Sequence, residues 1–206
     1  WSSPIELTKQ DRVKQMRDWL LRSKLVSSAA MSPADMDRYI AEIRAFRPAM
    51  LFGYPSSMTL LAQRAEQQGI RLDNLGIKVA FCTAERMYPH QADVLQRVFG
   101  CPVANGYGGR DSGFIAHACP QGGAHITAED IIVEIVDEQG RPVPHGEAGE
   151  VVITHLYSTG FPFVRYKNGD VAVLDDRQCP CGRGLPLLKE VRGRTNDVLL
   201  AEDGSV

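Results

Sequence analysis

Residues 101–125, CPVANGYGGRDSGFIAHACPQGGAH, contain the residue types in this chain that are best suited to chemistry. Residues 102–104 predict a short strand, and the glycine-rich residues 105–113 predict the turn after it, because repeated glycine disfavours the interior of a regular element. Backbone N–H groups in such a turn can approach a phosphate, while Arg110 offers a charged donor and Asp111 an oxygen ligand for Mg²⁺. Because open α/β sheets bind ligands beyond the ends of their strands, we expect a nucleotide site here. The alternative is a surface hairpin with solvated charges.

Cysteine and histidine residues indicate a second site. Cys119 and His125 lie in a segment rich in turn formers, and Cys179 and Cys181 form a Cys-Pro-Cys sequence further along the chain. Three thiolates and an imidazole are ligands that zinc takes, and four protein ligands leave no open position for catalysis. We therefore expect a structural zinc ion that braces the fold and stays out of the chemistry. Two alternatives remain open: reduced cysteines without metal, and His117 in place of His125.

Size and composition limit the class of protein. The chain has 206 residues, 44% of them hydrophobic, and a formal net charge of −2. It can bury a sizeable core, but it lacks the basic excess that a nucleic-acid or anionic-membrane surface requires. Because it has no run of about 18 apolar residues and no signal segment, we expect a cytoplasmic protein. The chain begins at Trp1 and ends in a polar turn, so we interpret it as part of a longer protein.

Strand, turn and helix alternate in the first half of the chain. Helices are predicted over residues 8–24, from the Ser32 cap to Pro48, over residues 55–69 and over residues 89–99, and strands over residues 50–54, 77–82 and 102–104. Strands that are joined by helices in this way pair in parallel. The turns at Gly53, Thr83 and Gly106 should therefore lie along one edge of one sheet.

From about Phe114 onward, strands follow one another without helices. They are predicted over residues 131–136, 150–154, 170–174 and 187–191. Such spacing is typical of an antiparallel or barrel-like arrangement. The predicted fold class is α/β: a parallel sheet with helices over residues 1–115, which is a partial nucleotide-binding subdomain, followed by a β subdomain with the zinc site over residues 116–206.

Three motifs resemble successive signatures of one superfamily. They read Tyr107-Gly108-Gly109-Arg110-Asp111, Arg165-Tyr166-Lys167-Asn168-Gly169-Asp170 and Gly193-Arg194-Thr195-Asn196-Asp197. In this order they resemble the adenylate-forming enzymes, which include acyl-coenzyme A synthetases and the adenylation domains of peptide synthetases. Gly53-Tyr54-Pro55-Ser56 and the two cysteine-containing loops are most similar to the phenylacetate-coenzyme A ligase branch and its capsular-polysaccharide relatives. The resemblance covers nearly the whole chain from about Asp11.

The resemblance implies a nucleotide site. It places the ring of Tyr107 against adenine, Asp170 at the ribose, and Arg194 at the ribose or a phosphate. Further residues that it implies for nucleotide binding, three of which would line the purine with backbone, are Thr83, Ala84, Glu85 and Gly108. Asn196 matches the hinge to a small C-terminal domain.

The resemblance implies catalytic roles for Asp111 and Arg110. Asp111 takes the place of the usual Glu that holds Mg²⁺ between phosphates. Arg110 replaces the Thr that most relatives direct at the α-phosphate, and its positive charge suits the same anion. The family's phosphate loop would precede residue 1 and its late catalytic lysine would follow residue 206. We therefore expect this chain alone to bind nucleotide weakly and not to turn over.

The activity that the resemblance implies is ATP-dependent carboxylate activation with Mg²⁺. A carboxylate attacks the α-phosphate of ATP to give an acyl-adenylate and pyrophosphate, and the acyl group then passes to coenzyme A as co-substrate. The implied substrate is an aryl or arylacetic acid, and the implied partners are small molecules, with no nucleic acid and no membrane. A homodimer is left open. The alternatives are a non-catalytic, zinc-braced nucleotide-binding module and an adenylating enzyme with an amine or sugar acceptor.

Overall fold

The first half of the chain folds as strands joined by helices. The computed structural model describes residues 9–195, and it confirms the predicted alternation and the α/β class. The elements are α1 (Lys9–Leu20), α2 (Pro33–Phe46), β1 (Met50–Gly53), α3 (Pro55–Gln67), β2 (Val79–Thr83), α4 (Pro89–Phe99) and β3 (Val103–Gly109). β1 pairs with β2, and β2 with β3, both in parallel. In this register Gly53 lies beside Cys82 and Thr83 beside Gly106, so the three positions at which turns were expected lie close together across β1–β3.

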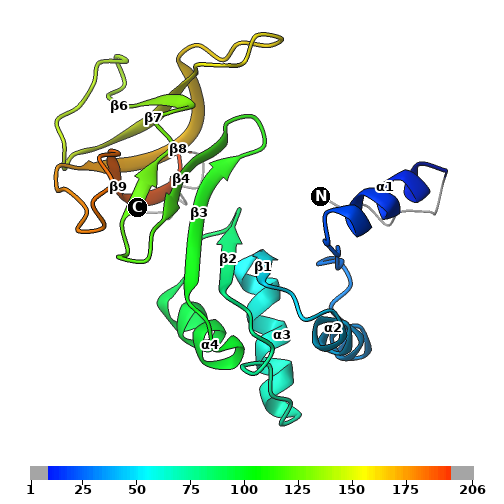
Figure 1. Ribbon diagram of the computed structural model, residues 1–206. Helices are drawn as coiled ribbons and strands as arrows, with labels where there is room; N and C mark the ends of the chain where they lie inside the picture. The colour runs from blue at the N-terminus through cyan, green and yellow to red at the C-terminus, as the bar shows by residue number, and fades with distance from the viewer. Residues whose placement is uncertain (1–8, 196–206) are drawn as a thin grey trace, which may run out of the picture.

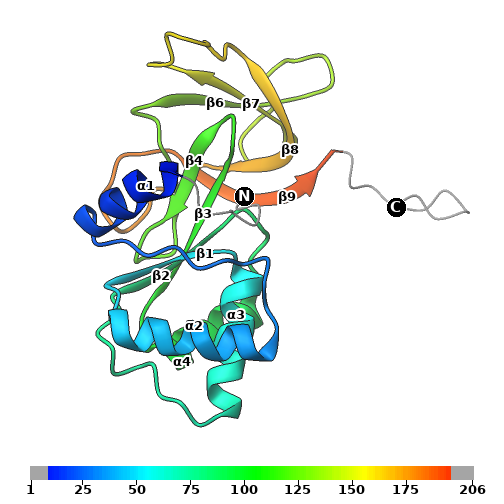
Figure 2. The ribbon, with the colours of Figure 1, turned by 90° about the vertical axis from the view of Figure 1, so that its right-hand side faces the viewer.

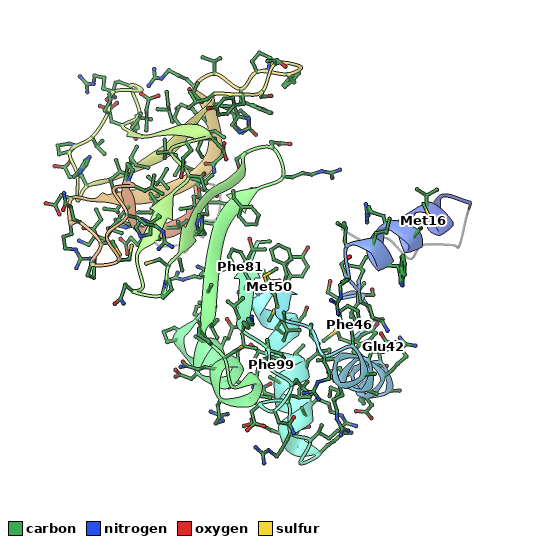
Figure 3. The ribbon with its side chains drawn as sticks, viewed as in Figure 1. Met16, Glu42, Phe46, Met50, Phe81 and Phe99 are labelled. Atoms are coloured by element: carbon green, nitrogen blue, oxygen red, sulfur yellow. The ribbon has the colours of Figure 1, made fainter. Side chains whose placement is uncertain are left out.

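Local signals explain where the helices begin and end. The Ser32 side chain accepts a hydrogen bond from the backbone N–H of Asp35 at 3.2 Å, which caps α2, and prolines occupy the first turns of α2, α3 and α4. Gly100 ends α4 in the left-handed conformation at φ 63°. The helix predicted over residues 8–24 is shorter, because α1 ends at Leu20. It stands apart from the other helices in Figure 1, and its Met16 is labelled in Figure 3.

The three packed helices share one core with the parallel strands. Ile40 of α2, Ala62 of α3 and Phe99 of α4 are each at most 1% exposed, and Phe99 is labelled in Figure 3. Two bidentate salt bridges join the helices at the surface. Arg64 of α3 donates to Asp37 of α2, and Arg97 of α4 donates to Glu66 of α3. The layer formed by α2–α4 packs against the parallel strands. Among the described residues there is no helix that combines the length and the apolar character of a membrane span.

The second half adds antiparallel strands to the same sheet. They are β4 (Gly113–Ala118), β5 (Ala124–Ile126), β6 (Ile131–Val136), β7 (Ala148–His155), β8 (Tyr166–Asp175) and β9 (Leu187–Arg194). The described strands form one sheet of nine in the order β1-β2-β3-β4-β5-β9-β8-β7-β6, which is not closed into a barrel. Figures 1 and 2 show α2–α4 packed at one end of the molecule and β6–β9 at the other. The predicted boundary near residue 115 falls inside β4, and the division into subdomains stays a prediction.

One part of the sequence-based assignment is wrong. Residues 105–109 belong to β3 and not to a turn, and the turn is confined to residues 110–112. The glycines are there because neighbours approach closely: a Cβ on Gly106 would lie 2.5 Å from the Phe81 ring, and one on Gly108 would lie 2.1 Å from the carbonyl oxygen of Gly113. The hairpin of β4 and β5 was not predicted either. Its strands are short and turn formers lie between them.

The middle of the sheet contains a short junction. β5 pairs with β9 through Ala124↔Leu188 and His125↔Leu187. On one side of this junction lie β1–β5, and on the other lie β6–β9. His125, one of the predicted zinc ligands, is part of this junction.

Candidate functional site

Side chains from β3 and β8 meet, although three strands lie between them in the sheet. The hydroxyl of Tyr107 on β3 donates to Oδ2 of Asp170 on β8 at 2.7 Å, with β4, β5 and β9 between these strands in the strand order. Nδ2 of Asn168 donates to the same carboxylate oxygen at 2.9 Å and to the Tyr107 oxygen at 3.0 Å. The sheet therefore curls until β3 and β8 touch through these side chains.

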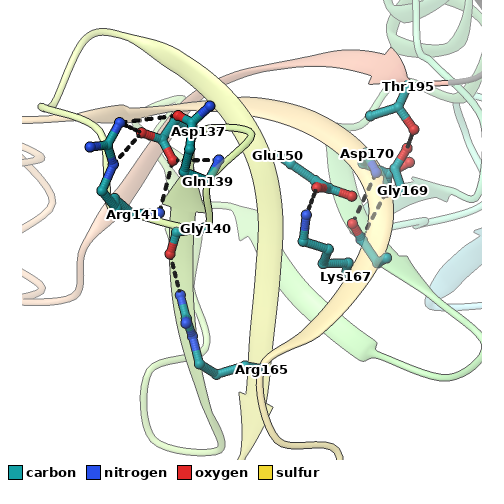
Figure 4. Close-up of polar contacts among 11 residues, drawn as sticks. Asp137, Gln139, Gly140, Arg141, Glu150, Arg165, Lys167, Gly169, Asp170 and Thr195 are labelled. Atoms are coloured by element: carbon teal, nitrogen blue, oxygen red, sulfur yellow. Dashed lines mark hydrogen bonds and ion pairs between the residues drawn. The ribbon is translucent and has the colours of Figure 1, made fainter.

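Arg194 on β9 adds a positive charge to this group, and we call Tyr107, Asn168, Asp170 and Arg194 the polar cluster. Arg194 Nε lies 3.5 Å from Asp170 Oδ1, and the Arg194 side chain is 68% exposed. The backbone N–H of Thr195, just after β9, donates to the carbonyl oxygen of Gly169 on β8 at 2.8 Å, and Figure 4 shows Thr195 and Gly169 beside Asp170. A carboxylate with spare acceptor capacity beside an exposed guanidinium can bind hydroxyls or an anion.

The environment of Tyr107 keeps it neutral. Burial raises the pKa of its hydroxyl well above the ordinary value; the hydrogen bond from Asn168 acts in the opposite direction, and the neighbouring Asp170 carboxylate raises the pKa further. A neutral hydroxyl can only donate to Asp170 while that group is a carboxylate. The network therefore has one arrangement of donors and acceptors at neutral pH, which holds the Tyr107 ring in place.

The turn between β3 and β4 carries the two predicted catalytic residues. Arg110 and Asp111 are both exposed. The hydroxyl of Tyr166 on β8 lies 3.5 Å from Asp111 Oδ2, so the turn faces the strand that also carries Asp170. Within residues 9–195, Asp111 shares no hydrogen bond with the polar cluster. The structure thus brings Tyr107, Asp170 and Arg194 together and leaves Asp111 near them, on its own turn.

The predicted purine-lining residues form a strained turn after β2. Ala84 has φ 68°, a left-handed conformation that is uncommon for a residue with a Cβ. Glu85 reaches the start of α3, where its Oε2 accepts from the backbone N–H of Ser56 at 3.3 Å. Thr83 is in register with Gly106 of β3, one residue before Tyr107. The turn therefore lies on the same edge of the sheet as the Tyr107 strand.

The sequence interpretation missed an aromatic cluster formed by Phe52, Phe81 and Phe114. The rings of Phe52 and Phe81 stack with centroids 5.6 Å apart, and Phe114 packs edge-on against both, at 6.4 and 5.8 Å. Phe52 is 57% exposed and Phe114 45% exposed. Phe52 and Phe81 are register partners in neighbouring parallel strands. Alignment of the two predicted strands could have found this pair, whereas Phe114 lies in a strand that was not predicted.

A pocket of about 320 Å³ lies behind the β3–β4 turn and away from the polar cluster. It is lined by Ser112, Gly113, Phe114, Thr127, Asp130, Ile131, His155, Tyr157 and Ser158. None of the predicted nucleotide residues lines it. The pocket and the polar cluster are therefore separate features of the described residues.

The four predicted zinc ligands, Cys119, His125, Cys179 and Cys181, do converge, and we call them the Cys/His cluster. Their ligand atoms all lie within 4.8 Å of one another. Cys119 Sγ is 3.5 Å from Cys179 Sγ, and Cys181 Sγ is 3.2 Å from His125 Nε2. His117 is the register partner of His125 but is not part of this cluster. Between the two histidines, the geometry therefore favours His125.

The surroundings of the Cys/His cluster suit a compact ligand set. His125 is 1% exposed, and its Nδ1 has no hydrogen-bond partner among the described residues. A Cβ on Gly123 would lie 2.8 Å from Cys179 Sγ and 3.3 Å from His125 Nε2, so glycine is required for this close approach. The backbone N–H of Arg183, together with the thiols of Cys179 and Cys119, lowers the pKa of Cys181 to about 6. A thiol that loses its proton near neutral pH is prepared to be a metal ligand.

Two of the five cysteines lie outside this cluster, as the sequence predicted. Cys82 and Cys101 are buried in the core beneath the parallel strands. Burial raises the pKa of Cys82 to about 11 and also raises that of Cys101. Both therefore remain neutral thiols that pack as small apolar residues.

The other sequence-based assignments can be placed as follows. Gly108 lies in β3 beside β4, and Asn196 lies outside the described residues. Asn168 was quoted within a motif but received no role, although it binds both Tyr107 and Asp170. The signal was an amide two residues before a carboxylate, because such a residue can fold back on the acid.

Comparison with known proteins gives one family. The family described as AMP-binding enzyme matches residues 19–159. The phenylacetate-coenzyme A ligase of Thermus thermophilus is 28% identical over 169 residues, which cover 80% of this chain and 38% of that protein. Protein CapK of Staphylococcus aureus is 24% identical over 194 residues, which cover 90% of this chain and 40% of CapK. The chain thus spans about two fifths of the length of these relatives.

A solved structure has a similar fold. It is 2-hydroxyisobutyryl-CoA ligase in complex with 2-HIB-AMP and CoA, with a TM-score of 0.74 and 28% sequence identity. The match covers 88% of this chain and 40% of that chain.

Proposed function

The chain belongs to the AMP-binding enzyme family, and from this premise we propose that the protein carrying it is an ATP-dependent acid–thiol ligase. A carboxylate oxygen of the substrate attacks the α-phosphorus of ATP, and the bond to pyrophosphate breaks. The sulfur of coenzyme A then attacks the acyl carbon, and AMP leaves. Similarity to a CoA ligase in complex with an acyl-AMP and CoA supports this order of steps.

The observation that carries the proposal is the contact of Tyr107 with Asp170 across the curled sheet. Residues far apart in sequence supply an aromatic ring, a carboxylate and, from Arg194, a guanidinium at one place. Such groups suit the base, the ribose hydroxyls and the phosphates of a nucleotide. In this arrangement adenine stacks on Tyr107 and the ribose hydroxyls donate to the free acceptor positions of Asp170.

The residues on the β3–β4 turn would act on the phosphates of the Mg·ATP substrate. We propose that the Asp111 carboxylate holds the magnesium ion and that Arg110 faces the α-phosphate. Both side chains are exposed on a turn beside the polar cluster, so they can reach a bound triphosphate. Their contribution would be positioning and charge neutralisation, which are the main needs of transfer at phosphorus.

The aromatic cluster supports an apolar acyl substrate. Phe52, Phe81 and Phe114 lie at the sheet edge that carries the Thr83–Glu85 turn, and a hydrogen in place of a Cβ on Gly106 leaves room for the Phe81 ring. We propose an aryl or arylacetic acid, in line with the phenylacetate-coenzyme A ligases among the relatives. Aromatic rings would pack against such an acid without a charged partner.

We also propose that the Cys/His cluster binds a structural zinc ion. Three thiolates and one imidazole in a buried, compact group match the tetrahedral ligand set of zinc and leave no position for substrate. The ion would join the β4–β5 loop to the β8–β9 loop beside the short β5–β9 junction. Thiolate ligands must stay reduced, so we place the protein in the cytoplasm.

ATP–pyrophosphate exchange on the protein carrying this chain tests the proposed function. Exchange that depends on an aryl or arylacetic acid, followed by thioester formation when coenzyme A is supplied, is the expected result. Exchange without thioester would indicate a different acceptor, such as an amine or a sugar. No exchange with any acid in a broad panel would favour a non-catalytic nucleotide-binding module.

A further inference from the structure

The turn that carries Arg110 and Asp111 is held by side chains from two other strands. Nε2 of His155, at the end of β7, lies 3.1 Å from the carbonyl oxygen of Ser112. The hydroxyl of Tyr166, at the start of β8, lies 3.5 Å from Asp111 Oδ2. His155 thus contacts the backbone of the turn, and Tyr166 contacts its carboxylate.

A third ring joins the two contacts. The Phe163 ring packs edge-on against His155 with centroids 5.3 Å apart and against Tyr166 at 4.7 Å. The backbone N–H of His155 also donates to the carbonyl oxygen of Phe163 at 2.9 Å. His155, Phe163 and Tyr166 therefore form one unit, which we call the aromatic brace.

The brace is anchored away from the turn. Arg165 donates through its guanidinium to Glu134 and to the carbonyl oxygen of Gly140 at 2.8 Å, as Figure 4 shows for Gly140. Its backbone N–H donates to Thr154 Oγ1 at 2.9 Å, and its φ of 47° lies in the left-handed region. These contacts fix the backbone between Phe163 and Tyr166, so the rings of the brace start from a rigid segment.

A pocket adjoins the turn on the side that His155 contacts. Ser112, Gly113 and His155 line the pocket of about 320 Å³ behind it. Ser112 itself is only 3% exposed. A buried carbonyl beside an open pocket depends on its hydrogen bond more than a carbonyl enclosed by side chains, because few other contacts would hold it in place. The His155 contact is thus the main restraint on the turn from this side.

We propose that the aromatic brace is a set of positioning residues, and that His155 fixes the turn so that Asp111 meets the magnesium ion of Mg·ATP. This inference rests on the proposed function. Because a carbonyl oxygen only accepts, His155 must carry its hydrogen on Nε2 to make this bond. None of the three rings is required to touch the substrate. Their effect passes through the backbone of residues 110–112.

A matched set of variants in the protein carrying this chain tests the proposal. His155→Leu keeps an apolar side chain against Phe163 but cannot donate, while His155→Gln offers an amide N–H at a similar reach. We expect His155→Leu to lower kcat/KM for Mg·ATP between ten- and a hundredfold, since displacement of a catalytic group by about 1 Å costs up to about a hundredfold. We expect His155→Gln to recover most of this loss. His145→Leu, at an exposed histidine between β6 and β7, is the control and should match wild type.

Two readouts separate positioning from general destabilisation. His155→Leu should raise the Mg²⁺ concentration for half-maximal rate and should speed hydrogen exchange of the amides in residues 110–113. Tyr166→Phe should shift the Mg²⁺ dependence by a smaller factor, because its contact with Asp111 is long. An unchanged Mg²⁺ dependence in His155→Leu, or an equal loss in His155→Leu and His155→Gln, would overturn the proposal.

The test also distinguishes this proposal from the proposed function. If the wild-type protein shows no exchange with any acid, the ligase assignment fails. Calorimetric titration with ATP, with and without Mg²⁺, and hydrogen exchange of the turn still decide the role of His155. Tighter binding with Mg²⁺ in wild type that disappears in His155→Leu, together with faster exchange of the turn, supports positioning. Equal results for the two proteins contradict it.

Discussion

The polar cluster and the Cys/His cluster both link the two parts of the curled sheet, but they do so with different chemistry. The polar cluster joins β3 to β8 and β9 through hydrogen bonds and one long ion pair, and its Arg194 side chain is 68% exposed. The Cys/His cluster joins the β4–β5 loop and β5 to the β8–β9 loop through four ligand atoms within 4.8 Å of one another. One cluster has an exposed charged side chain, and the other brings four potential metal ligands into one compact group.

This difference separates binding from support. A site for a ligand must keep hydrogen-bonding capacity free, and Asp170 and Arg194 keep it. A structural metal site uses all its ligands on the ion, as the Cys/His cluster would. The β5–β9 junction between the two clusters is short, with two register pairs. If the metal holds this junction closed, it sets the distance from Tyr107 to Asp170 without taking part in the reaction.

Loss of the metal should have the largest effect and should break the link between the clusters. We expect Cys179→Ser to reduce bound zinc from one equivalent to nearly none, since replacing one of four ligands removes a thiolate that the ion requires. Stability should fall by at least several kcal/mol, in keeping with the large folding contribution of structural zinc, about 10–16 kcal/mol in small zinc-binding peptides. Metal analysis and thermal unfolding measure the two outcomes.

Cys101→Ala is the matched control, because Cys101 is buried in the core beneath the parallel strands and away from the cluster. It should keep its zinc and lose only the packing of one sulfur atom. If wild-type protein purified without chelator contains less than half an equivalent of zinc, the metal assignment is wrong. The contrast between a cluster that binds a ligand and a cluster that binds a metal would then be lost.

A change in the glycines of β3 should have the next largest effect, because they determine how closely β3 and β4 approach. A Cβ on Gly108 would lie 2.1 Å from the backbone carbonyl oxygen of Gly113, and backbone cannot move aside as a side chain can. We expect Gly108→Ala to lower the free energy of unfolding by about 3 kcal/mol or more, at the upper end of the usual cost of overpacking. Gly106→Ala should cost less, since the Phe81 ring that it meets can rotate.

Gly160→Ala is the control for both substitutions. Nothing lies within 4 Å of a Cβ at Gly160, and its φ is not in the left-handed region. We expect a change within about 0.5 kcal/mol, as for ordinary surface substitutions. Chemical denaturation of the three variants gives the comparison, and equal stability of Gly108→Ala and Gly160→Ala would show that β3 and β4 are further apart than described.

These glycines also show how much of the fold could be predicted from sequence. The caps at Ser32 and Gly100 identify helix ends, because each depends on a local hydrogen bond or backbone conformation. The glycines of β3 were interpreted as a turn. The sequence shows which positions are glycine, but it does not show the structural reason. The reason is the Phe81 ring and the Gly113 carbonyl, which belong to other strands.

The same limit applied to the two clusters. Cysteine and histidine indicate potential metal ligands by residue type alone, so the sequence was sufficient to predict that these four side chains converge. In the polar cluster, Tyr107, Asp170 and Arg194 were identified only by the order of their motifs. Asn168 and Phe52 received no role, since their importance depends on contacts with other strands. Residue type predicts a metal site more directly than it predicts a binding site for a nucleotide.

Asp170→Asn should weaken nucleotide binding. This variant tests whether the polar cluster, and not the Cys/His cluster, is the one that binds a ligand. An amide keeps the size of the side chain but loses one acceptor and the negative charge. We expect the Kd for ATP to rise about tenfold, because a hydrogen bond to a charged group contributes about 1.5–3 kcal/mol. Asp175→Asn on the same strand is the control, as that carboxylate is already bound by Arg177. Calorimetric titration should find that Asp175→Asn binds ATP with the same affinity as wild type. If both variants bind ATP as wild type does, the nucleotide lies elsewhere.

The smallest effect that we expect concerns acid pH, and it sharpens the contrast between these two carboxylates of β8. Hydrogen bonds from the Arg177 guanidinium and backbone N–H lower the pKa of Asp175 from 3.8 to about 2. A carboxyl group with a lower pKa in the folded state stabilises the fold above its unfolded pKa, and this contribution is lost as pH falls through the folded value. The stability difference between wild type and Asp175→Asn should therefore shrink between about pH 4 and about pH 2.

Acid also removes metal from thiolate and imidazole ligands, but it does so in both proteins, so their difference isolates Asp175. Urea unfolding midpoints at several pH values measure this difference. A constant difference over that interval would mean that Arg177 does not lower the pKa of Asp175, and the choice of Asp175 as a carboxylate already satisfied by Arg177 would be wrong.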